Sequence, residues 1–392
     1  MARTCVDNCT GCRSGCIAAT LAAGLAVHPV MARQPSSPDQ VDSLLTSAGA
    51  IAVVRVARGL EHPWGMAFLP DGRALITERP GRLRILSSDG ALAPAIEGVP
   101  EVFAKGQGGL LDVGLDPHFK TNRFVYLSYA KPGPEGKAAT ALGRGKFTED
   151  DRLGDFTDIF VQEPWIEGSK HFGNRMVFTS DNMLFLALGE RFQFDPAQDL
   201  STHLGKVIRI HCDGSVPEDN PFVDQEDAKA EIWTLGHRNI ESAALHPETD
   251  ELWIVEMGPL GGDELNRPQA GRNYGWPEVS WGIDYNGDEI PDPPTRPEFA
   301  DAVRHWSPVI SPSGMIFYTG DVFKPWRNDA FVGGLSSRDL VRLRIKDGAV
   351  TEEERLPLPA RIREVEQGPE GRLYLLTDDK DGQVWRIQPL NP

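Results

Sequence analysis

A segment of turn residues followed by an apolar run recurs along this 392-residue chain. Its copies are LPDGRALITERPGRLRIL from Leu69, LDPHFKTNRFVYLSYA from Leu115, FTSDNMLFLALGE from Phe178, LHPETDELWIVEMGP from Leu245, SPSGMIFYTGDVF from Ser311 and GPEGRLYLLTDDKDGQVWRI from Gly368. The six copies begin about 45 to 67 residues apart, and each interval has room for roughly four short strands, the size of one propeller blade. The repeat therefore predicts an all-β, six-bladed β-propeller. A pair of β-sandwiches is the alternative, but sandwiches lack a motif that returns at so long a period.

The composition agrees with a fold made of many short strands. The 40 Gly and 31 Pro lie between apolar runs, a distribution typical of strands joined by turns, and hardly any segment sustains a helical period. The run Ile51–Val56 (IAVVRV) stands alone before the first copy. We expect it to pair with the last blade near Val384–Ile387, because closing the ring removes exposed sheet edges.

The charge and the apolar runs exclude two classes of partner. A formal net charge of −17 disfavours nucleic acid, since a phosphate backbone needs a basic face. No apolar run reaches the ~18 residues that a membrane-spanning helix requires. The sequence therefore predicts neither a nucleic-acid partner nor a membrane span.

The N-terminal residues resemble a secretory signal peptide. Ile17–Val27 is an Ala-rich apolar run preceded by arginines, and Val30-Met31-Ala32 provides an A-x-A-like cleavage site. We therefore expect a signal peptide at 1–32, a polar spacer at 33–50, the propeller at 51–392 and a periplasmic location.

Four cysteines lie within the predicted signal peptide: Cys5, Cys9, Cys12 and Cys16. Thiolates that close together could ligate a metal or a cluster. The simpler interpretation is a poorly constrained leader, because the segment has no strand or helix to hold such a site. After cleavage only Cys212 would remain, so the mature chain would contain no internal disulfide.

Polar clusters flank one predicted buried strand within 231–266. The turn and apolar run HPETDELWIV predict a hairpin corner that leads into this strand. His237-Arg238-Asn239 precede the strand, and Glu256-Met257-Gly258-Pro259 with Asp263-Glu264 follow it. A plain core strand needs no such residues, so we expect the loops at its ends to carry function.

A series of ordered motifs covers Val56–Ile387, nearly the whole predicted mature chain. They are LEHPWGMAFLPDG (60–72), GQGGLLDVGLDPHF (106–119), HFGNRMVF (171–178), HLGKVIRI (203–210), DGSVPEDNPF (213–222), LGHRN (235–239), GPLGGDELN (258–266), NYGWP (273–277), RIREV (361–365) and GPEGRLYLLTD (368–378). In these motifs the chain resembles the soluble pyrroloquinoline quinone (PQQ)-dependent aldose sugar dehydrogenases, the glucose/sorbosone dehydrogenase group. The resemblance implies a six-bladed quinoprotein that oxidises aldoses at C1 to the lactone, with PQQ as hydride acceptor. The electrons would then pass to a further acceptor, which the sequence does not identify.

The resemblance implies catalytic roles for His171, Glu190 and Arg238. His171 matches the family's base, and histidine suits that role because its ordinary pKa of ~6.5 lets it accept a proton near neutrality. On composition alone a loop histidine is usually solvated. Glu190 stands where the family has an aspartate that orients the base. Arg238 would polarise the quinone oxygen that gains charge.

Further residues match the family's cofactor-binding positions, namely Gln107, Arg238, Asn239, Tyr274, Trp276, Arg361 and Arg363. Arg361 and Arg363 alternate in RIR, so they point to one face of a strand and would bind cofactor carboxylates. Tyr274 and Trp276 in NYGWP would form a wall for a flat cofactor or sugar. The alternatives are a solvated strand face for RIR, a packed loop corner for NYGWP and an ordinary polar turn at Gln107.

Calcium is also implied by the resemblance. Gly258 and Pro259 match the pair whose carbonyls hold the ion, and hard cations take such oxygen ligands. The ion would act as a Lewis acid at the quinone. We expect Asp263 and Glu264 to pin this loop rather than to bind the ion.

The chain departs from the family pattern at three places. It has HRNIES where the family usually has HRNPQG, Glu190 in place of the shorter aspartate, and Ser336-Ser337 where the family has a lysine near the cofactor. A misplacement of about 1 Å can lower a rate on the order of a hundredfold. Two alternatives therefore stay open. One is a divergent binding propeller with weak or no turnover, and the other is a calcium-dependent lactonase, which would need a carboxylate/Asn cage around its ion.

Overall fold

A computed structural model describes residues 39–287, 290 and 294–390. The predicted signal peptide and its four cysteines lie outside these residues. Helical structure in the described part is limited to α1 (Phe119–Asn122) and three short 3₁₀ turns, η1 (Pro134–Gly136), η2 (Asp195–Gln198) and η3 (Lys324–Trp326). None of the helices described here is long and apolar enough to cross a membrane. The prediction of a nearly all-β protein is confirmed.

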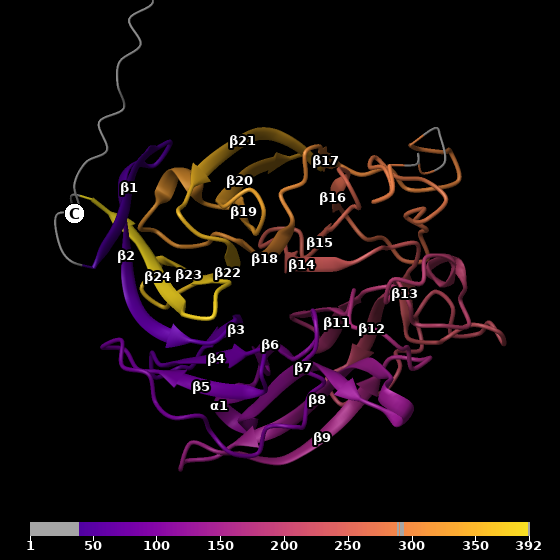
Figure 1. Ribbon diagram of the computed structural model, residues 1–392, viewed down its shortest axis with the longest axis horizontal. Helices are drawn as coiled ribbons and strands as arrows, with labels where there is room; N and C mark the ends of the chain where they lie inside the picture. Colours follow the sequence, from indigo (N-terminus) through magenta and orange to yellow (C-terminus); the bar gives the residue numbers. More distant parts are fainter. Residues whose placement is uncertain (1–38, 288–289, 291–293, 391–392) are drawn as a thin grey trace, which may run out of the picture. The chain divides into compact units, whose positions relative to one another are not determined.

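The strands form six antiparallel sheets that are the blades of a propeller, numbered here in chain order (Figure 1). Blade one contains β3 (Pro63–Phe68), β4 (Ala74–Glu78) and β5 (Arg82–Leu86). Blade two contains β6 (Leu110–Leu115), β7 (Phe124–Pro132), β8 (Ala138–Phe147) and β9 (Leu153–Val161). Blade three contains β10 (Gly173–Phe178), β11 (Met183–Leu188), β12 (Val207–His211) and β13 (Ile232–Thr234).

The remaining blades complete the ring. Blade four contains β14 (Ile240–Leu245), β15 (Leu252–Glu256), β16 (Asp263–Asn266) and β17 (Arg304–Trp306), and blade five contains β18 (Pro312–Phe317), β19 (Ala330–Gly334), β20 (Asp339–Lys346) and β21 (Ala349–Pro357). Blade six joins β22 (Ile362–Gln367), β23 (Leu373–Thr377) and β24 (Gly382–Pro389) to β2 (Gly49–Leu60) and β1 (Gln40–Thr46). Five of the six sequence repeats begin at or just before the turn between the first and second strands of a blade. The repeat at Ser311 begins one strand earlier, just before β18.

The ring closes as predicted, by pairing the N-terminal strand with the last one. In the antiparallel ladder of β2 and β24, Ile51 lies opposite Pro389, and Leu60 lies opposite Gly382. The pair is visible in Figure 1 as indigo beside yellow. Because β2 occupies the edge of β24, the last blade has no open edge at that strand.

The predicted spacer at 33–50 differs from the structure over its second half. Gln40–Thr46 forms β1, which pairs with β2 and extends blade six. The physical reason is the pair Val41 and Leu44, which pack against the hydrophobic core of the last two blades. Two apolar anchors in a polar segment were enough to add a strand at the edge of the sheet.

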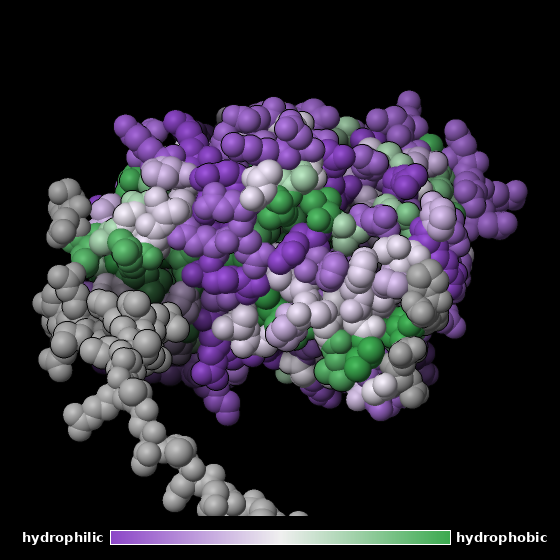
Figure 2. All heavy atoms as spheres, turned by 90° about the horizontal axis from the view of Figure 1, so that it is seen from above, coloured by the Kyte–Doolittle hydropathy of each residue, from purple (hydrophilic) through white to green (hydrophobic). Residues whose placement is uncertain are grey.

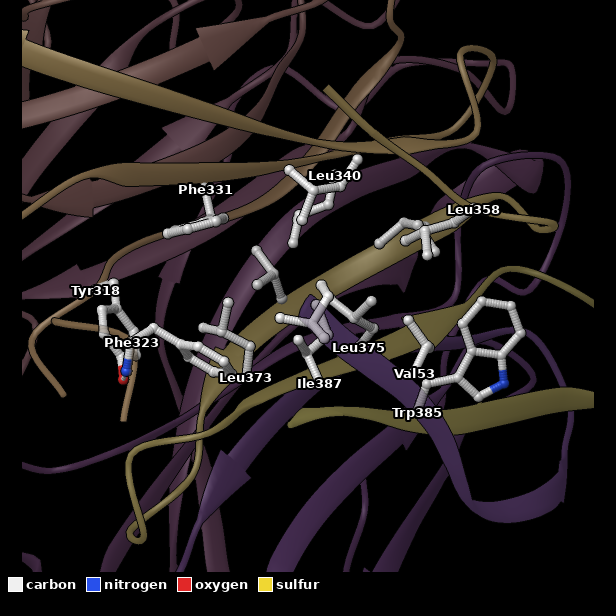
Figure 3. Close-up of a cluster of buried hydrophobic side chains, with 14 of the residues drawn as sticks. Val53, Tyr318, Phe323, Phe331, Leu340, Leu358, Leu373, Leu375, Trp385 and Ile387 are labelled. Atoms are coloured by element: carbon white, nitrogen blue, oxygen red, sulfur yellow. Dashed lines mark hydrogen bonds between the residues drawn. The ribbon is translucent and has the colours of Figure 1, made fainter. Parts of the chain in front are cut away.

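Adjacent blades pack through apolar side chains on their facing surfaces. Between blades five and six, Phe331 and Leu340 face Leu373 and Leu375, with Ile387 beside them (Figure 3). On the surface, hydrophilic residues predominate on the face in Figure 2, and apolar residues gather only in small areas. The core therefore lies between the blades, which leaves the strand ends and their loops available for function.

The innermost strand of every blade begins with a register shift against its neighbour. The shifts lie between Pro63 and Met66, Leu110 and Val113, Gly173 and Met176, Ile240 and Ser242, Pro312 and Met315, and Ile362 and Glu364. A bulge re-aims side chains and ends regular pairing. At these six register shifts, the side chains at the start of each innermost strand need not alternate between the two faces of the sheet.

Candidate functional site

Most of the residues matched to catalysis and cofactor binding lie at or near the starts of innermost strands, and hydrogen bonds connect them across blades. The exceptions are Glu190, which follows β11, and Tyr274 and Trp276, which lie between β16 and β17. Gln107 accepts a hydrogen bond from the main-chain N–H of His171 at 2.6 Å. Asn239 accepts one from Gly173 N–H at 3.1 Å, and Arg363 donates to Glu241 at 3.1 Å. Blades two, three, four and six therefore contribute to a single site.

His171 and Glu190 form a buried pair. Imidazole Nδ1 lies 2.9 Å from both carboxylate oxygens of Glu190, and no residue in the described part of the chain bonds Nε2. Burial lowers the pKa of His171 below its ordinary value, and the nearby Glu190 carboxylate offsets this only in part. His171 is therefore neutral at neutral pH, with Nδ1 held by the carboxylate and Nε2 free to accept a proton.

Two glycines allow the loop of His171 to approach strand β11. A Cβ on Gly173 would lie 2.6 Å from the main-chain carbon of Leu188, and Gly173 has a φ of +65°. A Cβ on Gly189 would lie 2.2 Å from the carbonyl oxygen of His171. The glycines of HFG and GER are thus needed for the contact between His171 and Glu190.

Glu190 reaches the histidine in spite of its extra methylene. Both of its carboxylate oxygens contact Nδ1 of His171, and Oε2 also accepts the main-chain N–H of Phe192. The Phe192 ring lies edge-on to the imidazole, with centroids 5.2 Å apart. The longer carboxylate is therefore accommodated by the local loop, and it orients the ring.

Arg238 lies at the centre of a corner made of carbonyl groups and aromatic rings. Its Nη1 donates to the carbonyl oxygens of Met257 and Gly258, both at 2.9 Å. Its guanidinium carbon lies 5.2 Å from the Trp276 ring and 5.7 Å from the Tyr285 ring. Its Nε is buried and has no partner. One donor of this cation is thus left for a ligand.

Asn239 is buried, and its side chain is engaged within the protein. Its Oδ1 accepts the N–H of Gly173, and its Nδ2 donates to Glu241 Oε1 at 2.9 Å. It joins the His171 loop to the arginine cluster, and its contact with a cofactor stays a prediction.

Arg361 and Arg363 converge on one carboxylate, as their alternation predicts. Asp378 Oδ2 lies 3.2 Å from Arg361 Nη2 and 3.1 Å from Arg363 Nη2. Burial raises the pKa of Asp378, but the charge of Arg363, a hydrogen bond from His62 and the charge of Arg361 outweigh it and hold this pKa below its ordinary value. The Nε of Arg363 is buried and unpartnered, so this arginine also keeps a donor for an anion.

The two aromatic residues of NYGWP lie in different surroundings. Trp276 is beside Arg238, and its ring centroid lies 5.4 Å from that of Phe194. Tyr274 stacks on His237 at 4.8 Å, and its hydroxyl donates to the carbonyl of Arg267 at 2.6 Å. Trp276 therefore borders the site, whereas the structure places the Tyr274 side chain in the packing behind it. The rings around Arg238 are completed by Phe192, Phe194 and Tyr285, which were not predicted from the sequence.

The loop matched to calcium is held by Asp263. Its Oδ1 accepts the N–H of Gly258 at 2.9 Å, and its Oδ2 accepts the N–H groups of Ile310 and Ser311 at 2.8 and 2.7 Å. Asp263 thus pins the loop, as expected. No cluster of three or more His, Cys, Asp or Glu side chains suited to a metal occurs among the described residues. In the structure the carbonyl oxygens of this loop point toward Arg238, which Met257 and Gly258 contact at 2.9 Å.

Three polar residues support the site without having been assigned a role from the sequence, although Glu256 lies in one of the flanking polar clusters named above. Glu256 accepts the main-chain N–H of Arg238 at 2.7 Å, and Glu241 bonds both Asn239 and Arg363. Arg175 donates to the main-chain carbonyls of Glu241 and Arg363 and lies 3.9 Å from the centre of the Trp64 ring. All three are charged residues within, or at the end of, the first or second strand of a blade. An ordinary core strand has no charged residue there, so this feature could have marked them in the sequence.

The unpartnered donors match the chemistry of PQQ, a planar quinone with carboxylate groups. Arg238 and Arg363 each keep a buried Nε without a partner, and an unmet buried donor is costly until an acceptor fills it. The rings around Arg238 offer flat surfaces. The residues present fit an anionic, planar group.

The sequence and the fold of this chain are similar to those of known dehydrogenases. The family model for Glucose / Sorbosone dehydrogenase matches residues 60–386. The aldose sugar dehydrogenase YliI of Escherichia coli K12 is 42% identical over 360 residues, covering 90% of this chain and 96% of the relative. A crystal structure of a glucose dehydrogenase superposes with a TM-score of 0.84 at 46% identity, covering 85% of this chain and 98% of that one. A PQQ-bound aldose sugar dehydrogenase of Streptomyces coelicolor superposes with a TM-score of 0.71 at 26% identity, covering 86% and 98% of the two chains. The chain belongs to the glucose/sorbosone dehydrogenase family.

Proposed function

We propose that this protein is a PQQ-dependent dehydrogenase that oxidises aldose sugars at C1 to the lactone. The observation that carries the proposal is the His171–Glu190 pair with its free Nε2, placed in one hydrogen-bonded network with arginines that keep unmet donors. Aldose dehydrogenation requires both parts, a base for the hydroxyl proton and a site for an anionic two-electron acceptor. The PQQ-bound relative from Streptomyces coelicolor supports the identity of that acceptor.

The chain's own residues account for the proton. Nε2 of neutral His171 takes the proton of the C1 hydroxyl as the C1–H bond breaks. Glu190 stabilises the imidazolium that forms, because its carboxylate faces Nδ1 at 2.9 Å. The ring of Phe192, which lies edge-on to His171, would limit water at the reacting carbon.

PQQ, when bound, supplies the acceptor for the hydride that leaves C1. Arg361 and Arg363 would hold its carboxylates, and Arg238 would face the oxygen on which charge develops. Gly258 and Pro259 would offer carbonyl oxygens to calcium, since this corner already directs carbonyls at a cation. Gln107, Asn239, Tyr274 and Trp276 complete the proposed set, with Asn239 and Tyr274 acting through the loops that they brace.

The protein would work in the periplasm and pass its electrons to an acceptor of unknown identity. The support is the apolar run at 17–27 followed by Ala32. N-terminal sequencing of exported protein should give a start near Arg33. An intact Met1 in a cytosolic fraction would contradict this location.

The direct test is reconstitution. Apo-protein is given PQQ and calcium, and reduction of an electron-accepting dye is followed with glucose and other aldoses. We expect dye reduction that requires PQQ, and a loss of activity with a calcium chelator that calcium reverses. Binding of PQQ without turnover would instead support a divergent binding propeller. Lactone hydrolysis without PQQ would support the lactonase.

A further inference from the structure

Arg79 is an arginine beside the site that has no part in the proposed machinery. It directly follows β4 of blade one, and its main chain bonds in two directions. Its N–H donates to the carbonyl of His62 at 3.1 Å, and its carbonyl accepts the N–H of Leu110 at 3.1 Å. Its guanidinium donates through Nη2 to the carbonyl of Gly106, while its Nε is buried and has no partner. Hydrogen bonds thus hold both the main chain and the guanidinium of Arg79, and its Nε–H remains available to an acceptor.

The neighbours of Arg79 lead to the arginine cluster of blade six. His62, which accepts its N–H, contacts Asp378 through Nδ1 at 3.2 Å. Asp378 in turn binds Arg361 and Arg363. Burial and the positive charge of Arg363 lower the pKa of Arg79, and the carboxylates of Asp378 and Glu241 oppose this only in part. Arg79 therefore interacts electrostatically with Asp378 and Glu241, the carboxylates that also bind the proposed cofactor arginines.

Two buried donors in this corner have no acceptor within the described part of the protein. The charges that act on Arg79 are those of Arg363, Asp378 and Glu241. Arg79 and Arg363 nevertheless each keep a buried Nε with no acceptor. Leaving such donors unmet is unfavourable unless the acceptor of a ligand fills them.

We propose that Arg79 is a further cofactor-binding residue, through which blade one donates to a carboxylate of the planar, anionic cofactor. This rests on the proposed function, since the ligand is the same PQQ. The assignment extends the site from blades two, three, four and six to blade one.

A second role for Arg79 has a different signature. Through Gly106 it braces the loop of Gln107, whose side chain accepts the N–H of His171. If this were its only role, loss of Arg79 would disturb the alignment of His171 and lower kcat at saturating cofactor. The affinity for PQQ would then be unchanged.

The experiment is isothermal titration of apo-protein with PQQ at fixed calcium, for wild type and three variants. We expect Arg79→Gln to bind at least tenfold more weakly and Arg79→Lys to recover part of the loss, because an ammonium lacks the planar fork. Arg363→Ala is the benchmark for loss of a cofactor arginine. The matched control is Arg73→Gln, which removes an arginine from the turn between β3 and β4, where its partners are the surface carboxylates Asp71 and Asp151. Its affinity should equal that of wild type, and circular dichroism checks that each variant is folded.

The outcomes separate the inference from the function on which it rests. Wild-type binding with an unchanged affinity in Arg79→Gln, while Arg363→Ala is weakened, would overturn the role of Arg79 alone. A wild-type protein that does not bind PQQ would overturn the proposed function, and the assignment of Arg79 with it. A loss of tenfold or more in Arg79→Gln, with a smaller loss in Arg79→Lys and none in Arg73→Gln, would support the assignment.

Discussion

Two histidine–glutamate pairs occupy equivalent places in consecutive blades. In blade three, His171 lies just before β10, and Glu190 lies just after β11. In blade four, His237 lies just before β14, and Glu256 ends β15. The two residues of each pair are 19 positions apart, and each imidazole Nδ1 contacts its carboxylate, at 2.9 Å in one pair and 2.8 Å in the other. The repeat has therefore placed the same dyad in two neighbouring blades.

The two pairs differ in what bonds the other ring nitrogen. His237 Nε2 contacts the hydroxyl of Thr234 at 2.9 Å, and its ring is stacked under Tyr274. His171 Nε2 has no partner among the described residues. The comparison teaches that a carboxylate behind a histidine is not enough for a base, because the second ring nitrogen must also be free. Only His171 meets that condition, whereas the pair in blade four has a structural role and holds Arg238 through Glu256.

The largest expected effect comes from removing the free nitrogen. His171→Gln should lower kcat for aldose oxidation by about 10²- to 10⁴-fold, the usual contribution of a general base. PQQ affinity, measured by titration, should stay at the wild-type value, because in the proposed site the cofactor would be held by arginines and calcium and not by His171. Activity that survives within about tenfold would show that His171 is not the base.

Shortening the carboxylate in blade three should have the next largest effect. In Glu190→Asp the carboxylate retreats by about 1 Å from Nδ1, and a displacement of that size can lower kcat on the order of a hundredfold. Steady-state kinetics on the PQQ-loaded enzyme would measure it. Equal kcat values for the wild type and Glu190→Asp would mean that the loop moves to bring the shorter carboxylate to His171. The length of the Glu190 side chain would then not matter for the site.

The equivalent change in blade four should act on stability. His237→Ala removes the partners of Thr234 and Glu256 in a fully buried place, and it should lower the free energy of unfolding by about 3 kcal/mol. Denaturant unfolding measures this, with His171→Gln as the matched variant that loses less. A His237→Ala protein with wild-type stability would contradict the structural role of the second pair.

The smallest expected effect is on the pH profile. Because burial lowers the pKa of His171, the base is neutral above that pKa, and kcat should rise with pH along an acidic limb centred below about 6.5. Glu190 raises the pKa of His171, so in Glu190→Gln the limb should move to still lower pH. Measuring kcat against pH for both proteins tests this. An acidic limb that moves to higher pH in Glu190→Gln would contradict the conclusion that the Glu190 carboxylate raises the pKa of His171.

The sequence predicted the fold because the fold is periodic. A motif of turn and apolar run had to recur once per blade, and the run Ile51–Val56 had no partner until the last blade supplied one. The strand β1 was missed because only Val41 and Leu44 mark it as part of the core. Two apolar residues in a polar segment give too weak a period to detect.

Part of the site could be found in the same way. Arg238 stands out because the polar cluster His237-Arg238-Asn239 flanks a predicted buried strand, whereas His171 and Arg361 were assigned through the family resemblance. The contacts of Glu241 and Arg79 could not be predicted, since each depends on side chains from another blade. The 19-residue spacing of the two histidine–glutamate pairs was present in the sequence, yet only the structure distinguishes the open pair from the closed one.

The pairing of β2 with β24 has a consequence for the order in which this protein is made. β2 leaves the ribosome early, while the strand that covers its edge ends only at Pro389. During most of synthesis the growing chain therefore carries an uncovered strand edge, which can pair with other chains. The proposed site also draws on this blade, because Arg361 and Arg363 lie at its first strand, β22. The last blade to be made thus supplies both the strand that covers the open edge and two arginines of the proposed site.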